Sequence, residues 1–186
     1  MKVVLISGTP KHEGLNCSTV EAAKEGAESA GAECEVVSLC DYKLIRCMMC
    51  DDGWGQCREE HTCLYGRDGF SEIQRKIAEA DAVILDTPVY WWDMTEVMKA
   101  FFDRFRRCEA RKGDDGAMAG KPVLLICSPG GTGNGMIGCL EQMERLCRHL
   151  RAEIFDFIGV NRWNGDYKLP AIRAAAALMA QGGKSA

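Results

Sequence analysis

The fold is decided by residues 82–92, which read AVILDTPVYWW. The first four residues are apolar without alternation, as expected of a strand that is covered on both faces in a parallel sheet. Pro88 ends this strand, because proline lacks the N–H donor that a central strand needs. Tyr90, Trp91 and Trp92 follow and must point in different directions, so some of this aromatic surface is available to a planar ligand. A cap on the sheet edge or a subunit contact is the alternative.

Four further strands are predicted around this one, and helices alternate with them. The strands are expected at residues 2–7, 33–39, 122–127 and 152–159. The helices are expected to end near residue 31 and to span residues 70–80, 93–111, 136–150 and 170–181. Short right-handed crossovers between such units predict an α/β fold with a doubly wound parallel sheet of strand order 2-1-3-4-5. Residues 1–186 are long enough for one domain with its own core.

Two more loops are expected at the same edge of the sheet as the aromatic one. Residues 8–19 combine small residues and hydroxyls at a helix N-terminus, which can offer N–H donors to a phosphate. This loop is neither GxGxxG nor a Walker loop, and a plain helix capped by Asn16 or Ser18 is the alternative. Residues 128–135 read SPGGTGNG and allow close backbone approach. The three loops together predict a mononucleotide site with a flat ring.

Composition limits the partners and the compartment. The formal net charge of -4 and the pI of about 5.5 argue against nucleic acid and anionic membranes. We expect Arg104, Arg106 and Arg107 to form a solvated helix face. Met1 and Lys2 lead directly into a strand, and no segment is long and apolar enough to span a bilayer. The sequence therefore predicts a cytoplasmic protein.

Eleven cysteines are a large number for this chain, and in a reducing cytosol they are poor candidates for a disulfide framework, so metal binding or redox chemistry is indicated. Six of them lie in apolar or helical segments and are predicted to be core residues: Cys34, Cys40, Cys108, Cys127, Cys139 and Cys147. Residues 40–67 form a long connection after the second strand, and long connections are usually functional. This excursion contains Cys47, Cys50, Cys57 and Cys63. Four thiolates in one loop can hold an iron–sulfur cluster or zinc, and packing without a metal is the third alternative.

The helix at residues 93–111 has an apolar stripe that is wide enough for the sheet and a second surface. Its members are Met94, Val97, Met98, Phe101, Phe102 and Phe105. Large exposed apolar patches mark interaction sites, so we expect a homodimer or a dimer of dimers.

Nearly the whole chain resembles the flavodoxin-like proteins of the NADPH-dependent FMN reductase and iron–sulfur flavoprotein group. The motifs that carry the resemblance are Ser7-Gly8-Thr9-Pro10-Lys11 with Asn16 nearby, Thr87-Pro88-Val89-Tyr90-Trp91-Trp92, Lys99-Ala100-Phe101-Phe102-Asp103-Arg104, and Gly130-Gly131. The spacing of the loop cysteines resembles that of iron–sulfur flavoproteins as well.

This resemblance implies specific ligands for two cofactors. In the first loop, the residues implied to bind FMN, mainly through its phosphate, are Ser7, Thr9, Lys11, Asn16, Cys17 and Ser18. The residues implied to line the isoalloxazine are Pro88, Val89, Tyr90, Trp91 and Trp92, with Ser128, Gly130, Gly131, Thr132 and Gly133. The ligands implied for an iron–sulfur cluster of the 4Fe-4S type are Cys47, Cys50, Cys57 and Cys63. The cysteine excursion is expected to start near the flavin, since the second strand ends at the same edge.

Three functions follow as expectations. The first is an FMN-dependent redox protein with an iron–sulfur cluster, which transfers electrons between a reduced donor and a partner protein or small acceptor. The second is an NAD(P)H-dependent FMN or quinone reductase without a cluster. The third is a non-catalytic, zinc-stabilised binding module, because a fold does not secure a function. No acid, base or nucleophile stands out, and Tyr90 and Asp93 are the residues that could touch a substrate.

Overall fold

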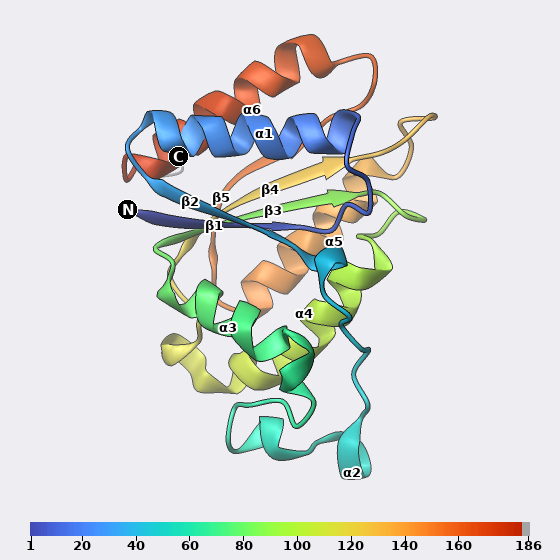
Figure 1. Cartoon of the computed structure of the whole chain (residues 1–186), viewed down its shortest axis with the longest axis vertical. Coiled ribbons are helices and arrows are strands. Elements are labelled where there is room, and N and C mark those ends of the chain that lie inside the picture. The colour runs from blue at the N-terminus through green and yellow to red at the C-terminus, as the bar shows by residue number, and fades with distance from the viewer. Residues whose placement is uncertain (184–186) are drawn as a thin grey trace.

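The computed structural model describes residues 1–183 and contains one five-stranded parallel sheet (Figure 1). Its strands are β1 (Lys2–Ser7), β2 (Glu33–Ser38), β3 (Ala82–Pro88), β4 (Pro122–Ser128) and β5 (Glu153–Gly159). The spatial order is β2-β1-β3-β4-β5, and every neighbouring pair is parallel. The predicted doubly wound topology is therefore confirmed.

Helices cover both faces of the sheet (Figure 1). On one face lie α1 (Leu15–Ser29) and α6 (Gly165–Ala180), and on the other lie α3 (Phe70–Glu79), α4 (Glu96–Glu109) and α5 (Met136–His149). All residues of β3 are buried, and they alternate between the two cores: Ile84 packs on the α1 and α6 side, and Leu85 packs on the opposite side. Among residues 1–183, none of the helices combines the length and the apolar character that a membrane span requires.

Three helix starts differ from the predicted ones. Gly14 is the N-cap residue of α1, so Asn16 and Ser18 lie inside the first turn, and the alternative of a helix capped by one of them is wrong. α4 begins three residues later than expected, because residues 90–93 form a separate tight turn. α6 begins at Gly165, ahead of Pro170, which the helix accommodates in its second turn without its N–H donor.

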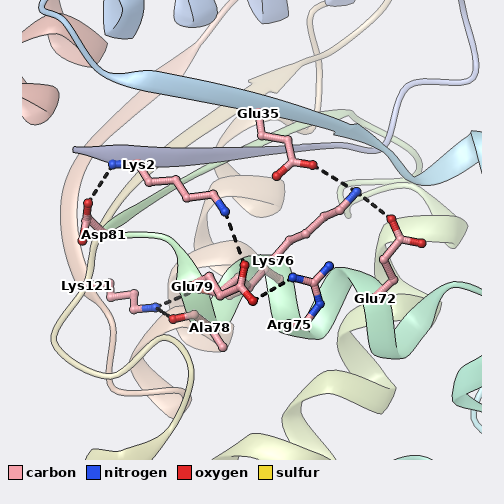
Figure 2. Close-up of polar contacts among 10 residues, drawn as sticks. Lys2, Glu35, Glu72, Arg75, Lys76, Ala78, Glu79, Asp81 and Lys121 are labelled. Atoms are coloured by element: carbon pink, nitrogen blue, oxygen red, sulfur yellow. Dashed lines mark hydrogen bonds and ion pairs between the residues drawn. The ribbon is translucent and has the colours of Figure 1, made fainter.

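Salt bridges and backbone contacts fix α3 against the edge of the sheet (Figure 2). Lys76 bridges Glu72 of its own helix at 2.7 Å and Glu35 of β2 at 3.1 Å. Lys121, which precedes β4, donates to the carbonyl oxygen of Ala78 at 2.7 Å. Partly exposed pairs such as these contribute up to about 1 kcal/mol each, so their main effect is to orient the helix.

The apolar stripe of α4 is covered within this chain. Its buried members are Met94, Met98, Phe101, Phe102 and Phe105, and Val97 is half-buried against the same core. Three of the phenylalanines pack as a cluster with ring centroids 5.1–5.8 Å apart. The stripe therefore does not offer the exposed interface from which we expected a homodimer or a dimer of dimers, and the oligomeric state stays a prediction.

Gly26 of α1 lies directly against the backbone of α6. An added Cβ would overlap the carbonyl oxygen of Arg173 and lie 2.9 Å from its Cα. We expect Gly26→Ala to push the two helices apart and to lower the free energy of unfolding by about 1–3 kcal/mol. Denaturant unfolding measures this change.

Gly165→Ala is the matched control, because the nearest atom to an added Cβ there is 3.9 Å away. Its stability should stay within about 1 kcal/mol of the wild type. A Gly26→Ala protein that is as stable as this control would contradict the packing argument.

Candidate functional site

The loop after β1 forms one side of a pocket at the carboxyl edge of the sheet. Four of its predicted residues line this pocket: Ser7, Thr9, Lys11 and Cys17. The loop is shaped by its own side chains, since the Thr9 N–H donates to Ser7 Oγ and the Lys11 N–H donates to Thr9 Oγ1, both at 3.3 Å. The first turn of α1 follows directly and leaves N–H donors without helical acceptors. This arrangement suits an anion such as a phosphate.

Asn16 and Ser18 do not line this pocket. Ser18 Oγ donates to the Gly14 carbonyl at 3.4 Å, so the hydroxyl is engaged within the helix. Asn16 Nδ2 is buried and has no hydrogen-bond partner within residues 1–183. An unsatisfied buried donor costs about 1–3 kcal/mol. The amide of Asn16 is therefore a donor whose acceptor a ligand could supply.

The aromatic loop after β3 is a strained tight turn. Tyr90 and Asp93 exchange both backbone hydrogen bonds, at 2.8 and 3.0 Å. Trp91 and Trp92 between them have φ values of 51° and 65°, as in a type I′ turn, which normally requires glycine or asparagine. Such a backbone costs about 1–3 kcal/mol per residue. The side chain of Trp91 is nevertheless 91% exposed, so the turn holds a large indole in solvent.

A second pocket lies between this turn and the glycine-rich loop after β4. Its lining includes six predicted residues, Val89, Trp91, Trp92, Gly130, Gly131 and Thr132. The predicted residues outside its lining are Pro88, Tyr90, Ser128 and Gly133. The two loops are joined by the Val89 N–H, which donates to the Ser128 carbonyl at 3.2 Å. Ser128 Oγ is buried without a partner among residues 1–183.

Gly138 in α5 and Asp86 in β3 belong to this edge, and the sequence reasoning missed both. An added Cβ at Gly138 would lie 3.2 Å from the backbone oxygen of Trp92, so glycine lets the turn pack on α5. Asp86 is fully buried, and its neighbour in the β1–β3 register is Ser7. An aspartate inside an otherwise apolar strand was the signal that could have identified it.

Asp86 is built to carry a proton near neutral pH. Burial raises the pKa of Asp86 to about 7, against the lowering effect of a hydrogen bond to Thr19. Thr19 Oγ1 lies 2.7 Å from Asp86 Oδ2 and 2.8 Å from the Asn16 carbonyl oxygen. One hydroxyl has a single proton, so it cannot donate to both oxygens. A protonated Asp86 resolves the conflict, because it donates to Thr19, and Thr19 then donates to Asn16.

The cysteine excursion leaves the carboxyl end of β2 and runs away from that edge, beyond α3 and α4 (Figure 1). It contains a short turn of helix, α2 (Cys50–Gly53), and its backbone has positive φ at Met49 and Asp51, on either side of Cys50. The expectation that the excursion starts near the candidate flavin edge is met only at its beginning. Cys40, its first residue, lines the pocket beside the β1 loop, whereas the four predicted metal ligands lie elsewhere.

All four predicted metal ligands line one pocket: Cys47, Cys50, Cys57 and Cys63. Cys108 of α4 lines it too, although the sequence assigned Cys108 to the core alone. Within residues 1–183, no group of three or more His, Cys, Asp or Glu side chains is arranged to hold a metal ion. The predicted ligands therefore line the same pocket, but their side chains are not arranged around a common metal position. Cys40 is exposed, so its assignment to the core is wrong, and Cys34 is half-buried.

Arg104 is buried beside these cysteines, which corrects the prediction that it belongs to a solvated helix face. Only 2% of the residue is exposed. Its guanidinium pairs with Asp68 at 2.6 Å and reaches Cys63 Sγ at 3.4 Å. Burial alone would raise the pKa of Asp68, but the hydrogen bond from Arg104 holds that pKa below its ordinary value. Arg107, half-buried, donates to the carbonyl of Gly53.

The cysteine pocket and the aromatic turn lie at opposite ends of α4. The helix begins at Glu96, just after the turn, and Cys108 is its penultimate residue. At 1.5 Å per residue this separation is about 18 Å along the helix axis. The chain thus has two candidate sites, connected by one helix.

The doubly wound sheet, with three distinct loops at one carboxyl edge, defines a protein of the flavodoxin-like class. The family model described as NADPH-dependent FMN reductase matches residues 1–157, and the chain belongs to this family.

Relatives and solved structures agree with this assignment. An iron–sulfur flavoprotein of Methanocaldococcus jannaschii is 38% identical over 106 residues, which cover 57% of this chain and 52% of that protein. An iron–sulfur flavoprotein of Methanosarcina thermophila is 35% identical over 56% of this chain and 52% of its own. The chain thus spans about half the length of these curated relatives. The NAD(P)H:quinone oxidoreductase structure from Methanothermobacter marburgensis shares the fold, with a TM-score of 0.72 at 20% identity over 96% of each chain.

Replacing Asp86 by asparagine should flatten the pH dependence of stability. The folded-state pKa of about 7 lies above the ordinary value of 3.8, so the folded wild type binds more protons than the unfolded chain between these values. Its free energy of unfolding therefore falls as the pH rises through that window. The shift corresponds to on the order of 4 kcal/mol.

Denaturant unfolding at about pH 4, 5.5 and 8 would test this. The stability of Asp86→Asn relative to the wild type should rise steadily across the series. Asp156→Asn, at an exposed aspartate on β5, should show no such trend. A constant difference between Asp86→Asn and the wild type would contradict the assignment.

Proposed function

We propose that this protein is an FMN-dependent oxidoreductase that holds an iron–sulfur cluster of the 4Fe-4S type in its cysteine pocket. It passes electrons between a reduced donor and a partner protein or small acceptor. The observation that carries the proposal is the gathering of Cys47, Cys50, Cys57 and Cys63 around one pocket, in a chain of the FMN reductase family. NAD(P)H is the donor that the family description suggests.

FMN, when bound, supplies hydride and single-electron chemistry, and the protein supplies position and environment. The loop after β1 would hold the phosphate with its backbone donors and Lys11, which lines the pocket. The amide of Asn16 lies outside this lining, and its buried Nδ2 has no partner within residues 1–183. Trp91, Trp92 and the Gly130-Gly131 backbone line the second pocket and would flank the ring of FMN there. Below its raised pKa of about 7, Asp86 is neutral and adds no negative charge next to the phosphate-binding loop.

The donor set of the cysteine pocket suits iron. Thiolates are soft ligands that favour iron–sulfur clusters and zinc over hard cations. Arg46, Arg104 and Arg107 also line the pocket, so guanidinium groups surround the thiols and can balance the charge of an anionic centre. Both iron–sulfur flavoproteins among the relatives described above carry the corresponding cofactors in their names.

A reductase without a cluster is the second candidate. It is favoured by one observation, that no three potential ligands among residues 1–183 are arranged around a common point. In this case the chain transfers electrons from NAD(P)H through FMN to a flavin or a quinone, and the cysteine excursion only covers α4. A zinc-stabilised module without turnover has less support, because the chain belongs to a family of reductases. A cytoplasmic location and a homo-oligomeric state remain predictions.

Stoichiometry on anaerobically purified protein distinguishes the candidates. We expect one FMN per chain, with iron and sulfide in equal amounts and a broad absorbance shoulder near ~400 nm beside the flavin bands. Flavin without iron would favour the reductase, and zinc without flavin would favour the binding module. A colourless protein that does not take up added FMN would exclude both redox functions.

Replacing Cys50 or Cys57 by serine should abolish the cluster and leave FMN bound. A serine hydroxyl is a poor substitute for a thiolate toward iron, and the flavin loops are at the other end of α4. Iron, sulfide and flavin analysis measures both outcomes. Cys34→Ser, on β2 and outside the pocket, is the control that should keep full iron content. Unchanged iron and sulfide in the Cys50 and Cys57 variants would show that these residues are not ligands.

Replacing Trp91 by glycine should weaken FMN binding about tenfold without lowering stability. Glycine adopts positive φ freely, so relief of strain raises the free energy of unfolding by about 1–2 kcal/mol, while the aromatic contact is lost. Trp91→Phe keeps an aromatic ring and should retain most of the affinity. Fluorescence titration with FMN and denaturant unfolding provide the two measurements, and equal FMN affinity in all three proteins would exclude Trp91 from the flavin site.

A further inference from the structure

Arg104 forms hydrogen bonds to both ends of the segment that contains the four loop cysteines. Its Nη1 donates to the Ile45 carbonyl at 3.1 Å, before Cys47, and its Nη2 donates to the Tyr65 carbonyl at 2.9 Å, after Cys63. Asp68 adds a bidentate pair at 2.6 and 3.1 Å. One buried side chain of α4 therefore holds both the entry and the exit of the loop.

The same guanidinium is in contact with the thiols. Nη2 lies 3.4 Å from Cys63 Sγ, and Arg104 lines the pocket that contains the other three loop cysteines. Its Nε is buried and has no hydrogen-bond partner within residues 1–183. A buried guanidinium N–H without an acceptor is costly. Within residues 1–183, the guanidinium of Arg104 thus has one donor without an acceptor, in addition to the contact with Cys63.

The arginines that line the pocket favour an anionic group in this position, mainly Arg46 and Arg107, because Asp68 already balances the charge of Arg104. Arg104 has Asp68 as its carboxylate partner, and its guanidinium also lies 4.3 Å from the ring centroid of Phe70. Arg107 lines the same pocket one turn further along α4. A centre held by several thiolates is anionic, and positive charge and N–H···S hydrogen bonds stabilise its reduced form, which has one more negative charge than the oxidised form.

We propose that Arg104 is the positioning and tuning residue of the cysteine pocket. It holds residues 45–68 against α4 before any metal is bound, and its N–H···S contact with Cys63 raises the reduction potential of the centre that the thiols hold. The positioning part requires only the contacts described here. The tuning part rests on the proposed function, because it requires an iron–sulfur cluster.

The first experiment uses the metal-free full-length protein, so it does not depend on the cluster. Amide hydrogen exchange over residues 45–68 is compared for the wild type, Arg104→Gln, Arg104→Lys and Arg106→Gln. We expect Arg104→Gln to exchange at least about tenfold faster than the wild type, and Arg104→Lys to be intermediate, since lysine keeps the charge but cannot form the forked contacts. Arg106→Gln is the matched control, because it removes the same charge from the same helix outside the pocket.

The second experiment measures the midpoint potential of the reconstituted protein by a redox titration followed by absorbance and EPR. We expect a lower potential in Arg104→Lys, a still lower one in Arg104→Gln, and an unchanged one in Arg106→Gln. A purely structural anchor would leave the potential unchanged in the lysine variant, which also serves if the glutamine variant does not fold. Wild-type exchange rates in both Arg104 variants would overturn the positioning role, and a wild-type potential in Arg104→Lys would overturn the tuning role.

If the wild type takes up no iron, the proposed function and the tuning role both fail. The exchange experiment still decides the positioning role, because it is performed without metal. The failure of the two proposals can therefore be distinguished.

Discussion

The parallel pairing of β3 between β1 and β4 is the constraint on which the rest of the structure depends. In this register Ser7 lies beside Asp86, and Pro88 lies beside Ser128, so three strands end at one edge. Parallel neighbours cannot be joined by hairpins, and the helical crossovers that join them cover both faces of the sheet. The loops at the carboxyl ends do not have to pack along the strands. In these loops the sequence changes from apolar to hydroxyl-rich, aromatic and glycine-rich.

Several features that lower stability are concentrated at this edge. Asp86 is a buried carboxyl group with a raised pKa, and two tryptophans occupy left-handed positions in one turn. The side chains of Asn16 and Ser128 have buried polar atoms without partners in residues 1–183. Strain and unsatisfied groups persist only where the surrounding fold is stable enough to impose them. The buried sheet supplies that stability. The edge can therefore hold unpaired donors that a ligand could satisfy and exposed aromatic rings that a ligand could contact.

The sequence predicted the strands, the helices and their topology, which depend on the pattern of apolar residues. It did not predict the burial of single side chains, which depends on their neighbours in space. The apolar run of β3 and the alternation of strands with helices were sufficient for the topology, because short crossovers leave few alternatives. Arg104 was misassigned as solvated by its charge, although it shares the buried face of α4 with Phe101 and Cys108, three residues before it and four after it. Cysteine spacing identified the loop, but it could not determine whether the sulfur atoms converge, since this depends on how the loop folds over α4.

The helix α4 fixes the positions of the two candidate sites relative to each other. Its first turn follows the strained aromatic turn, and its last turns contain Arg104, Arg107 and Cys108, which line the cysteine pocket. A packed helix is rigid over this length, so a change in the cysteine loop does not need to disturb the candidate flavin edge, and the reverse also holds. Along its axis, α4 places Glu96, next to the aromatic turn, about 18 Å from Cys108 in the cysteine pocket. The position of the cysteine pocket on α4 therefore depends on the contacts that anchor the excursion to this helix, such as those of Arg104, as much as on the cysteines themselves.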